Sequence, residues 1–263
     1  MTSEIFKHVS TIQCAASGGS FEWADAKVVV EQNVLLTVNG ESWFTLVCTP
    51  QDIQALAIGF LYNEGIINAY DEVTSYQVNP DSTRIDITLR HPAIRPDHWH
   101  RTTTTMSSLP SDPSKPWRAP CRNQILLEPH EIPRLFRNFI LMQTLHNQVG
   151  GFHSAALSDG QEISMVVEDI GRHNTLDKIS GLILLHETSL EPRVVLFSGR
   201  VSSEILFKTQ RIGACMVISR TGPTSHSINL AEEWDITLIG YARGERFSIY
   251  THPERVLLLP PKE

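Results

Sequence analysis

After Pro129, short apolar and β-branched runs alternate with longer segments whose apolar residues recur at helical spacing. Strands that are linked through helices pair in parallel and are buried on both faces, so they are apolar throughout. We therefore predict an α/β domain over residues 126–263, with a mainly parallel sheet and helices on both of its faces. The expected strands are 155–157, 163–167, 194–197, 216–218 and 236–239, and the expected helices are 132–148, 175–185, 203–212 and 225–233.

The first half of the chain has a different pattern, in which short β-branched runs at 28–30, 34–38 and 43–47 predict strands. Asn39-Gly40 is a hairpin signal between the last two. Residues 84–89 alternate strictly between polar and apolar, as a strand with one buried face does. We predict a smaller, β-rich α+β domain over residues 1–115.

One helix is expected within this first domain, over an apolar stripe that begins at Ile53. Thr49 is the predicted cap, Pro50 suits the first helical position, and Gly65 is the predicted end. Between residues 91 and 122 the chain is rich in Pro, Ser, Thr and Asp, so we predict a mobile loop or linker and place the domain boundary there.

Composition excludes several classes of protein. The net charge of -7 argues against a general nucleic-acid surface, although it leaves room for a small basic pocket that holds one phosphorylated ligand. No apolar run is long enough for a membrane span, and the N-terminus carries no export signal, so we expect a cytoplasmic protein. The four cysteines form no C-x-x-C pair, which favours thiols over a disulfide framework or a zinc ribbon.

The densest group of polar side chains lies at 168–178, directly after the apolar run 163–167. In open α/β sheets, ligands bind in the crevice beyond the carboxyl ends of the strands. We therefore predict that Asp169, Arg172, His173 and Lys178 line a binding pocket. The alternative is a well-capped helix start, which would explain Asn174 and Asp177 but not the other four.

Two further loops have the composition of anion sites. Each follows a strand, opens a helix and joins an arginine to hydroxyl groups where the helix dipole is positive. The alternative is a hydroxyl-capped helix start beside a surface arginine. The predicted ligand-binding residues of the two loops are Ser198, Gly199, Arg200, Ser202, Ser219 and Thr224.

The segment 241–246 places an aromatic ring beside two guanidinium groups after the last expected strand, which suits base stacking with phosphate contact. The alternative is a strand-connecting turn at Gly244 with surface arginines. Gly150-Gly151-Phe152-His153 is either a glycine helix cap or a close backbone approach to a ligand.

Together these segments resemble the FdhD/NarQ family of formate dehydrogenase accessory proteins. The resemblance rests on G-G-F-H-S-A-A-L at 150–157, E-D-I-G-R-H-N-T-L-D-K at 168–178 and S-G-R-V-S-S-E at 198–204. It extends to S-R-T-G-P-T-S at 219–225 and Y-A-R-G-E-R-F-S-I-Y-T-H-P at 241–253. In the first half, V-N-G at 38–40 and the segment 48–67 also match.

The resemblance implies a cytoplasmic, homodimeric sulfur carrier whose second half has a cytidine-deaminase-like fold. Such a carrier takes persulfide sulfur from a cysteine desulfurase and delivers it to the molybdenum bis(guanine dinucleotide) cofactor of the formate dehydrogenase apo-enzyme. It is a sulfurtransferase-type carrier rather than a turnover enzyme. The guanine-nucleotide segment of the family falls on Tyr241, Ala242, Arg243, Gly244, Glu245 and Arg246.

One departure from the family concerns the persulfide cysteine. The family has a C-x-x-C loop, whereas the only loop cysteine here is Cys121, in P-C-R-N-Q at 120–124. Arg118 and Arg122 nearby favour a reactive thiolate at Cys121, our candidate catalytic residue. The alternative is a loop thiol without function, with the family's motif falling instead near 108–111, where no cysteine stands. Cys48 and Cys215 lie among apolar residues and are expected to be inert core thiols.

Two functions therefore stay open: a sulfur carrier that acts through Cys121, and a cofactor-binding or insertion protein that has lost sulfur transfer. A third, a zinc deaminase, lacks its motif. That chemistry needs a metal-binding His, a Glu two residues on and a following P-C-x-x-C, but His153 is followed by Ser154-Ala155. We predict no bound metal.

Overall fold

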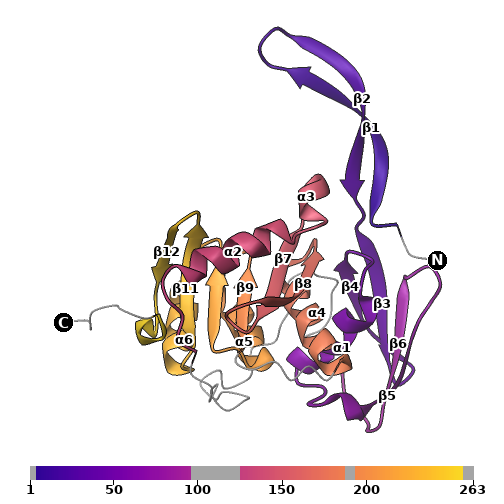
Figure 1. Cartoon of the computed structure of the whole chain (residues 1–263). Helices are drawn as coiled ribbons and strands as arrows, with labels where there is room; N and C mark the ends of the chain where they lie inside the picture. The colour runs from indigo at the N-terminus through magenta and orange to yellow at the C-terminus, as the bar shows by residue number, and fades with distance from the viewer. Residues whose placement is uncertain (1–3, 96–124, 187–192, 257–263) are drawn as a thin grey trace.

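The computed structural model describes residues 4–95, 125–186 and 193–256. Figure 1 shows two sheets with helices between and beside them and a long hairpin that projects from the body. The elements in chain order are β1 (Phe6–Ala15), β2 (Ser20–Val29), β3 (Gln32–Val38), β4 (Glu41–Cys48), α1 (Ile53–Asn63), η1 (Tyr70–Glu72), β5 (Val73–Val78), β6 (Arg84–Leu89), α2 (Glu131–Leu141), α3 (His146–Val149), β7 (His153–Ser158), β8 (Ile163–Asp169), α4 (Arg172–Leu185), β9 (Val194–Phe197), α5 (Ser203–Ile212), β10 (Met216–Ser219), α6 (Ser225–Glu233), β11 (Thr237–Arg243), β12 (Arg246–Ile249) and η2 (Pro253–Arg255).

The larger sheet has six strands in the order β12-β11-β10-β9-β7-β8. Strands β9, β10 and β11 pair in parallel, as predicted. However, β7 is antiparallel to both β8 and β9, and β12 is antiparallel to β11, so the sheet is mixed rather than mainly parallel. The reason is that β7 to β8 and β11 to β12 are joined by tight turns, which permit only antiparallel pairing.

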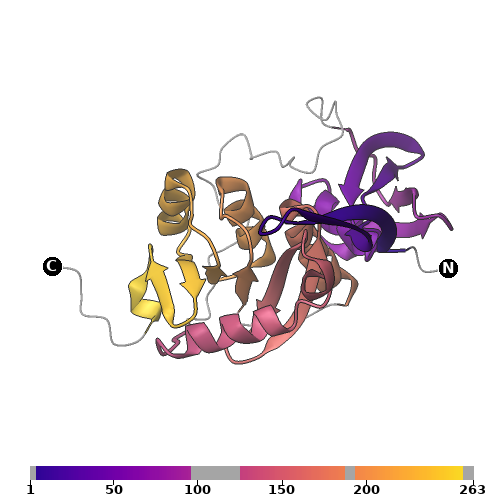
Figure 2. The same cartoon turned by 90° about the horizontal axis from the view of Figure 1, so that it is seen from above.

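Helices cover both faces of this sheet, as predicted, and each face has its own apolar core. Helices α4, α5 and α6 pack on one face around Phe197, Phe207 and Leu238. Helix α2 packs on the other face around Phe136 and Ile218. Figure 2 shows α2 on one side of the strands and α5 and α6 on the other.

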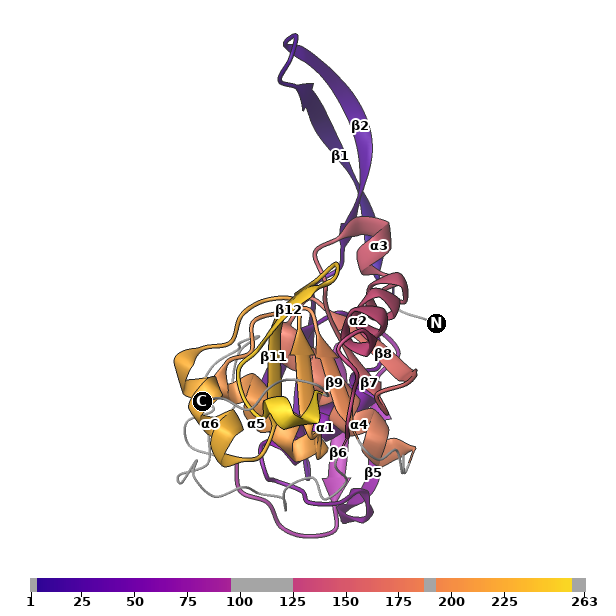
Figure 3. The same ribbon diagram turned by 60° about the vertical axis from the view of Figure 1, so that its left-hand side comes forward.

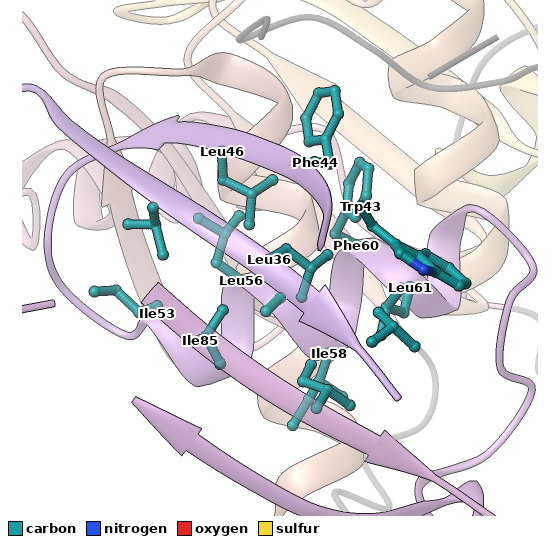
Figure 4. Packing of buried hydrophobic residues seen from close by; sticks show 14 of the residues in the cluster. Leu36, Trp43, Phe44, Leu46, Ile53, Leu56, Ile58, Phe60, Leu61 and Ile85 are labelled. Carbon is teal, nitrogen blue, oxygen red and sulfur yellow. The ribbon is translucent and has the colours of Figure 1, made fainter. Parts of the chain in front are cut away.

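The smaller sheet has the order β4-β3-β6-β5 and packs on α1. Figure 4 shows that side chains of the strands and of helix α1, among them Leu36, Ile85 and Leu56, meet in one apolar cluster. The predicted hairpin between β3 and β4 is confirmed: Asn39 and Gly40 both have positive φ, at 52° and 85°. This is the backbone that a tight two-residue hairpin turn requires.

Helix α1 begins later than predicted. Its cap position is Asp52, and Thr49 does not cap it. Thr49 is buried, its backbone N–H donates to the Asp169 carboxylate at 3.1 Å, and its hydroxyl accepts from Ile170 N. Gly65, with φ 72°, follows the end of the helix as expected.

The predicted helix 132–148 is two helices, because α2 ends at Leu141 and α3 begins at His146. The carboxylate of Glu168, at the end of β8, accepts hydrogen bonds from the backbone N–H groups of Leu145 and His146. A carboxylate at a helix N-terminus satisfies donors that the helix cannot pair itself. The side chain of Glu168, which is distant in sequence, therefore determines where α3 begins.

Helices α1 and α4 join the two halves of the molecule through two glycines. A Cβ placed on Gly59 would lie 1.8 Å from the carbonyl oxygen of Asp177, and one on Gly181 would lie 1.9 Å from that of Ala55. No side chain fits at either position, so the two helix backbones are in direct contact. Apolar residues at the end of α4, Leu184 and Leu185, pack against the first-half core.

The β1–β2 hairpin was not predicted, apart from its last residues. It forms a separate two-stranded ribbon that extends past α3 and away from both sheets (Figure 3). The predicted linker falls mainly on 96–124, outside the described residues.

We predict that Gly181→Ala destabilises the protein by at least about 3 kcal/mol, because the new methyl group must force apart two helix backbones. The free energy of unfolding, measured in urea, checks this. The matched control is Asn138→Ala, on the exposed side of α2, which should change stability by less than about 0.5 kcal/mol. Equal stability of the two variants would contradict the α1–α4 contact.

Candidate functional site

The predicted binding loops meet at one edge of the six-stranded sheet. Strands β8, β9, β10 and β11 run in the same direction, so their carboxyl ends share that edge. Strand β7 runs the opposite way, and its first residue, His153, pairs with Asp169 at the end of β8. The loops at 150–153, 169–172, 198–202 and 219–224 therefore lie along one rim of the sheet, where the sequence analysis predicted a ligand-binding crevice.

Asp169 and Lys178 lie beneath this rim rather than on it. Their side chains form an ion pair at 2.7 Å and are fully buried. Asp169 also accepts hydrogen bonds from the backbone N–H of Gly171 and from the Asn174 side chain, each at 2.8 Å. The structure thus differs from the predicted pocket lining: these two residues support the rim and have no surface to offer a ligand.

A second buried ion pair lies next to the first. The Lys208 ammonium on α5 is 2.6 and 2.7 Å from the two carboxylate oxygens of Asp177 on α4. Asn63, on α1, donates to the same carboxylate and accepts from the Ser180 hydroxyl. A buried pair of this kind is costly to break, because removal of one partner leaves an unpaired charge. The pair therefore ties α1, α4 and α5 together.

Arg172 and His173 stand at the first turn of α4, which begins three residues earlier than the predicted helix. Arg172 Nε donates to His173 Nε2 at 3.2 Å, and Glu204 Oε2 lies 3.4 Å from the same nitrogen. Gly199 lies below the neighbouring His153 ring, because a Cβ there would be 3.3 Å from its Nδ1. The rim thus holds two imidazoles, one guanidinium and one carboxyl group.

Burial controls the protonation of this group. Burial, together with the positive charges of Lys208 and Arg172, lowers the pKa of His173 to about 3. Burial also lowers the pKa of His153 and raises that of Glu204. With Nε2 accepting from Arg172, the proton of neutral His173 is on Nδ1, which has no hydrogen-bond partner in the described part of the chain. Because His173 is 1% exposed and its Nδ1 is buried, this imidazole lies just beneath the surface of the group, as Asp169 and Lys178 do.

The four hydroxyl groups predicted as ligands in the two anion loops are already engaged. Ser202 caps α5 and Thr224 caps α6. The Ser198 hydroxyl accepts from Ser154 N, and the Ser219 hydroxyl donates to Gly199 O. The alternative reading of the sequence, hydroxyl-capped helix starts, therefore describes these side chains. The arginines Arg200 and Arg220 are exposed and free to meet an anion at the helix N-termini.

These two loops and the 241–246 segment form one continuous surface. Val201 and Pro223 form a β-bridge, and Arg220 N donates to Phe197 O. The Arg243 guanidinium donates from Nε to Arg220 O at 3.1 Å.

Segment 241–246 is the turn between β11 and β12, with Gly244 at φ 56°, as the alternative reading proposed. Tyr241 is nevertheless unusual, because it has φ 54° at a break in strand register between Gly240 and Arg243. Strained backbone of this kind is concentrated at functional sites. The ring is half-exposed beside Gly222, where a Cβ would lie 2.5 Å from its hydroxyl oxygen.

The other residues of this turn have different environments. Ala242 is buried, Arg246 is exposed, and Glu245 forms an exposed ion pair with Arg137. The candidate persulfide cysteine, Cys121, lies outside the described residues. Cys48 and Cys215 are buried free thiols, so the prediction that they lie in the core is confirmed, and burial raises the pKa of Cys48 to about 12.

Glu204 was missed as a site residue. It is the last residue of the motif at 198–204, and its place in the first turn of a helix that follows a strand could have marked it as a candidate. Its contact with His173 could not be predicted, because it joins two separate helices. A different polar group, Asp235, His252 and Glu254, has metal-ligand spacing at the opposite edge of the sheet. There Arg255 Nη2 lies 2.6 Å from Asp235, which already neutralises one carboxylate. We assign no metal to it.

A comparison with known protein families identifies the family of this chain. The model of the FdhD/NarQ family matches residues 29–257. The chain belongs to the FdhD/NarQ family. The match includes every loop of the rim, so the resemblance seen in the sequence is confirmed.

Curated relatives within the family cover nearly the whole chain. The sulfur carrier protein FdhD of Shouchella clausii is 37% identical over 244 residues, which are 89% of this chain and 91% of the relative. That of Bacillus subtilis is 34% identical over 246 residues, covering 90% and 93%.

The fold is also found in a solved structure. A crystal structure from Desulfotalea psychrophila, described as that of a formate dehydrogenase accessory protein, matches with a TM-score of 0.81 at 26% identity. The match covers 97% of this chain and all of the other. None of the helices in the described ranges has both the length and the apolar character of a membrane span.

We predict that His173 makes stability depend on pH. Its pKa falls from 6.5 in the unfolded chain to about 3 in the folded one, so between these values the unfolded state binds more protons. The free energy of unfolding should therefore decrease as the pH falls from 6.5, by up to about 1.4 kcal/mol per pH unit from this group.

His173→Gln should flatten this slope in urea unfolding measured between about pH 4.5 and 8, because Gln has no proton to gain. The matched control is His226→Gln, an exposed change on α6 that should keep the wild-type slope. An imidazole resonance of His173 that titrates near pH 6.5 would contradict the buried, neutral state.

Proposed function

We propose that this protein is a sulfur carrier required for formate dehydrogenase activity. It would take persulfide sulfur from a cysteine desulfurase and pass it to the molybdenum bis(guanine dinucleotide) cofactor before the apo-enzyme receives it. The observation that carries the proposal is the similarity to proteins named sulfur carrier protein FdhD, at 34% to 37% identity over about nine-tenths of both chains. We further propose that it acts in the cytoplasm and as a homodimer, with no nucleic-acid or membrane partner.

The rim of the six-stranded sheet suits the nucleotide part of this cargo. Tyr241 offers a half-exposed ring for stacking on guanine, and Arg243 and Arg246 lie exposed beside it. Arg200 and Arg220 stand at the N-termini of α5 and α6, where a pyrophosphate is favoured. The guanidinium groups and helix ends, rather than the serine hydroxyls, are the groups available to hold the phosphates.

The remaining rim residues would face the rest of the cargo. His173 and His153 are neutral near pH 7, and Arg172 supplies a fixed positive charge beside them. His153 and Arg172 are partly exposed and would present donors to oxygen atoms of the cargo, whereas His173 is buried beneath them. We propose that Asp169 and Lys178 hold Arg172 and His173 in place from below, since they form the buried end of the same loop.

The sulfur step would be carried by Cys121. A thiolate there would attack the outer sulfur of the desulfurase persulfide, so that an S–S bond forms on Cys121 and the desulfurase thiolate leaves. Arg118 and Arg122 favour the thiolate state. The proposal does not make this protein a turnover enzyme, because the sulfur it gives up must be replaced by the desulfurase.

A second function is favoured by one observation, the absence of the family's second loop cysteine. In that case the protein would bind the cofactor or dock the apo-enzyme without carrying sulfur. The two functions share the nucleotide site and differ only in the thiol chemistry.

We predict that Tyr241→Ala weakens GDP binding by about 5-fold to 150-fold, because loss of one base–aromatic stack costs about 1–3 kcal/mol. Isothermal titration calorimetry checks this. The matched control is Tyr76→Ala, which removes another half-exposed tyrosine, on β5, and should bind GDP like the wild type. Equal binding by all three proteins would place the guanine elsewhere.

We predict that incubation with a cysteine desulfurase and cysteine adds one sulfur atom to the wild-type protein and none to Cys121→Ala, as read by intact-mass spectrometry. Cys14→Ala, which removes the exposed thiol of β1, is the control and should still gain sulfur. A wild type that gains no sulfur but binds GDP would favour the cofactor-binding function. Sulfur gained by Cys121→Ala would assign the carrier to another thiol.

A further inference from the structure

A cavity with a volume of about 440 Å³ lies between the two halves of the molecule. Its first-half wall is formed by Tyr62, near the end of α1, and by residues 68–71 around η1. Its second-half wall comes from the last turns of α4 and α5 and from Arg193, directly before β9. Pockets that hold small molecules have volumes of roughly 300 to 1,000 Å³, so this cavity is large enough for a ligand.

The cavity lies at the opposite end of the six-stranded sheet from the rim. The rim is formed where β9 ends and α4 and α5 begin, whereas the cavity lies where β9 begins and α4 and α5 end. Helix α4 connects the two places and spans about 21 Å at the usual rise per residue. A ligand in this cavity would therefore not share the proposed nucleotide site.

Arg211, on α5, is a buried cation that is held in one orientation. It is 3% exposed, and its guanidinium carbon lies 3.9 Å from the centroid of the Tyr62 ring. Its Nη2 donates to the carbonyl oxygens of Tyr62 and Ile67, and the Tyr62 hydroxyl donates to Arg211 O at 3.0 Å. A planar cation that is stacked and bonded in this way is organised before a ligand binds.

Arg193 supplies a second buried guanidinium group to the lining. It is 5% exposed, and its Nη1 donates to Ile212 O at the end of α5. Among the described lining residues the carboxylate is that of Asp71, which is 73% exposed and lies 4.0 Å from Arg90. Guanidinium groups recognise carboxylates through paired, charge-assisted hydrogen bonds. The described lining therefore favours a ligand with a negative charge.

The alternative role of both arginines is to cap helix ends. Each donates to a carbonyl oxygen in the last turn of α1 or α5, as basic side chains near helix C-termini commonly do. Capping explains these contacts but not the cavity beside them, because protein interiors are close-packed and seldom leave a space of this volume.

The remaining wall of the cavity is largely apolar. Ile183 and Leu184, in the last turns of α4, and Tyr70 of η1 are partly exposed there. Sites for organic ligands combine apolar walls with a few polar groups that fix the orientation of the ligand. A bare phosphate or sulfate ion would gain little from such a wall, whereas a carbon skeleton would leave water on contact with it. The walls thus favour an organic acid over an inorganic anion.

We propose that this cavity binds a small organic carboxylate. The carboxylate lies toward the guanidinium groups of Arg193 and Arg211, and the carbon skeleton packs against Ile183 and Leu184. The proposal depends neither on sulfur transfer nor on nucleotide binding, so its failure would leave the proposed function unchanged.

The test is isothermal titration calorimetry of the full chain with phenylpropionate and with its neutral analogue of the same shape, phenylpropionamide. We expect the carboxylate to bind with a dissociation constant of about 1 mM or tighter. The amide should bind at least about 10-fold more weakly, because it lacks the charge that the guanidinium groups recognise. Equal binding of the two probes, or no binding of the carboxylate, would overturn the proposal.

Variants locate the probe. Ala69→Trp places an indole ring at an exposed position of the lining and should abolish binding, whereas Asn138→Trp, on the exposed side of α2, is the matched control and should bind like the wild type. Arg211→Lys keeps the charge but loses the planar fork, so it should weaken binding at least about 10-fold.

Two results with these variants would overturn the proposal. Phenylpropionate that still binds to Ala69→Trp would lie outside the cavity. Binding that is lost in Tyr241→Ala would place the probe on the rim. Urea unfolding of each variant separates a lost site from a lost fold, and Ala69→Trp keeps the test decisive if Arg211→Lys does not fold.

Discussion

Helices α1 and α4 pack with their backbones in direct contact, and the arrangement of the two halves of the molecule depends on this contact. Only glycine fits at positions 59 and 181. The helices bring polar groups of both halves into the interior, where each needs a partner. The ion pairs Asp169–Lys178 and Asp177–Lys208 are those partners, and Thr49 and Asn63 of the first half complete them. The floor of the site is thus shared by the two sheets.

The C-terminal elements could be predicted closely from the sequence. The bounds of β9, α5 and α6 match residue for residue, since apolar periodicity and hydroxyl caps agree there. The break after α2 could not be predicted, because it depends on the carboxylate of Glu168 from another strand. The β1–β2 hairpin also gave little signal, since its apolar residues are not buried by the body.

The loops selected from the sequence do converge in the structure, but the burial of their residues was predicted only in part. A strand end followed by a polar loop predicts which edge of a sheet binds ligands, and that edge is where the loops converge. The sequence does not show whether a charged side chain at that edge points into solvent or into the protein interior, because its burial depends on the neighbouring helix. Asp169 and Lys178 point down onto each other, whereas Arg172 stays partly exposed. Tyr241 was predicted from its neighbours, but its left-handed backbone was not.

The glycine contact also limits how the molecule can respond to the proposed cargo. Helices α1 and α4 cannot slide or separate without exposing two paired charges. The two halves of the molecule therefore do not close on a ligand by a hinge motion. The rim of the six-stranded sheet is organised before any ligand binds, so little free energy of association is lost in ordering it. Discrimination between cargo molecules must then come from the loops above this floor, where single residues can change without disturbing the frame.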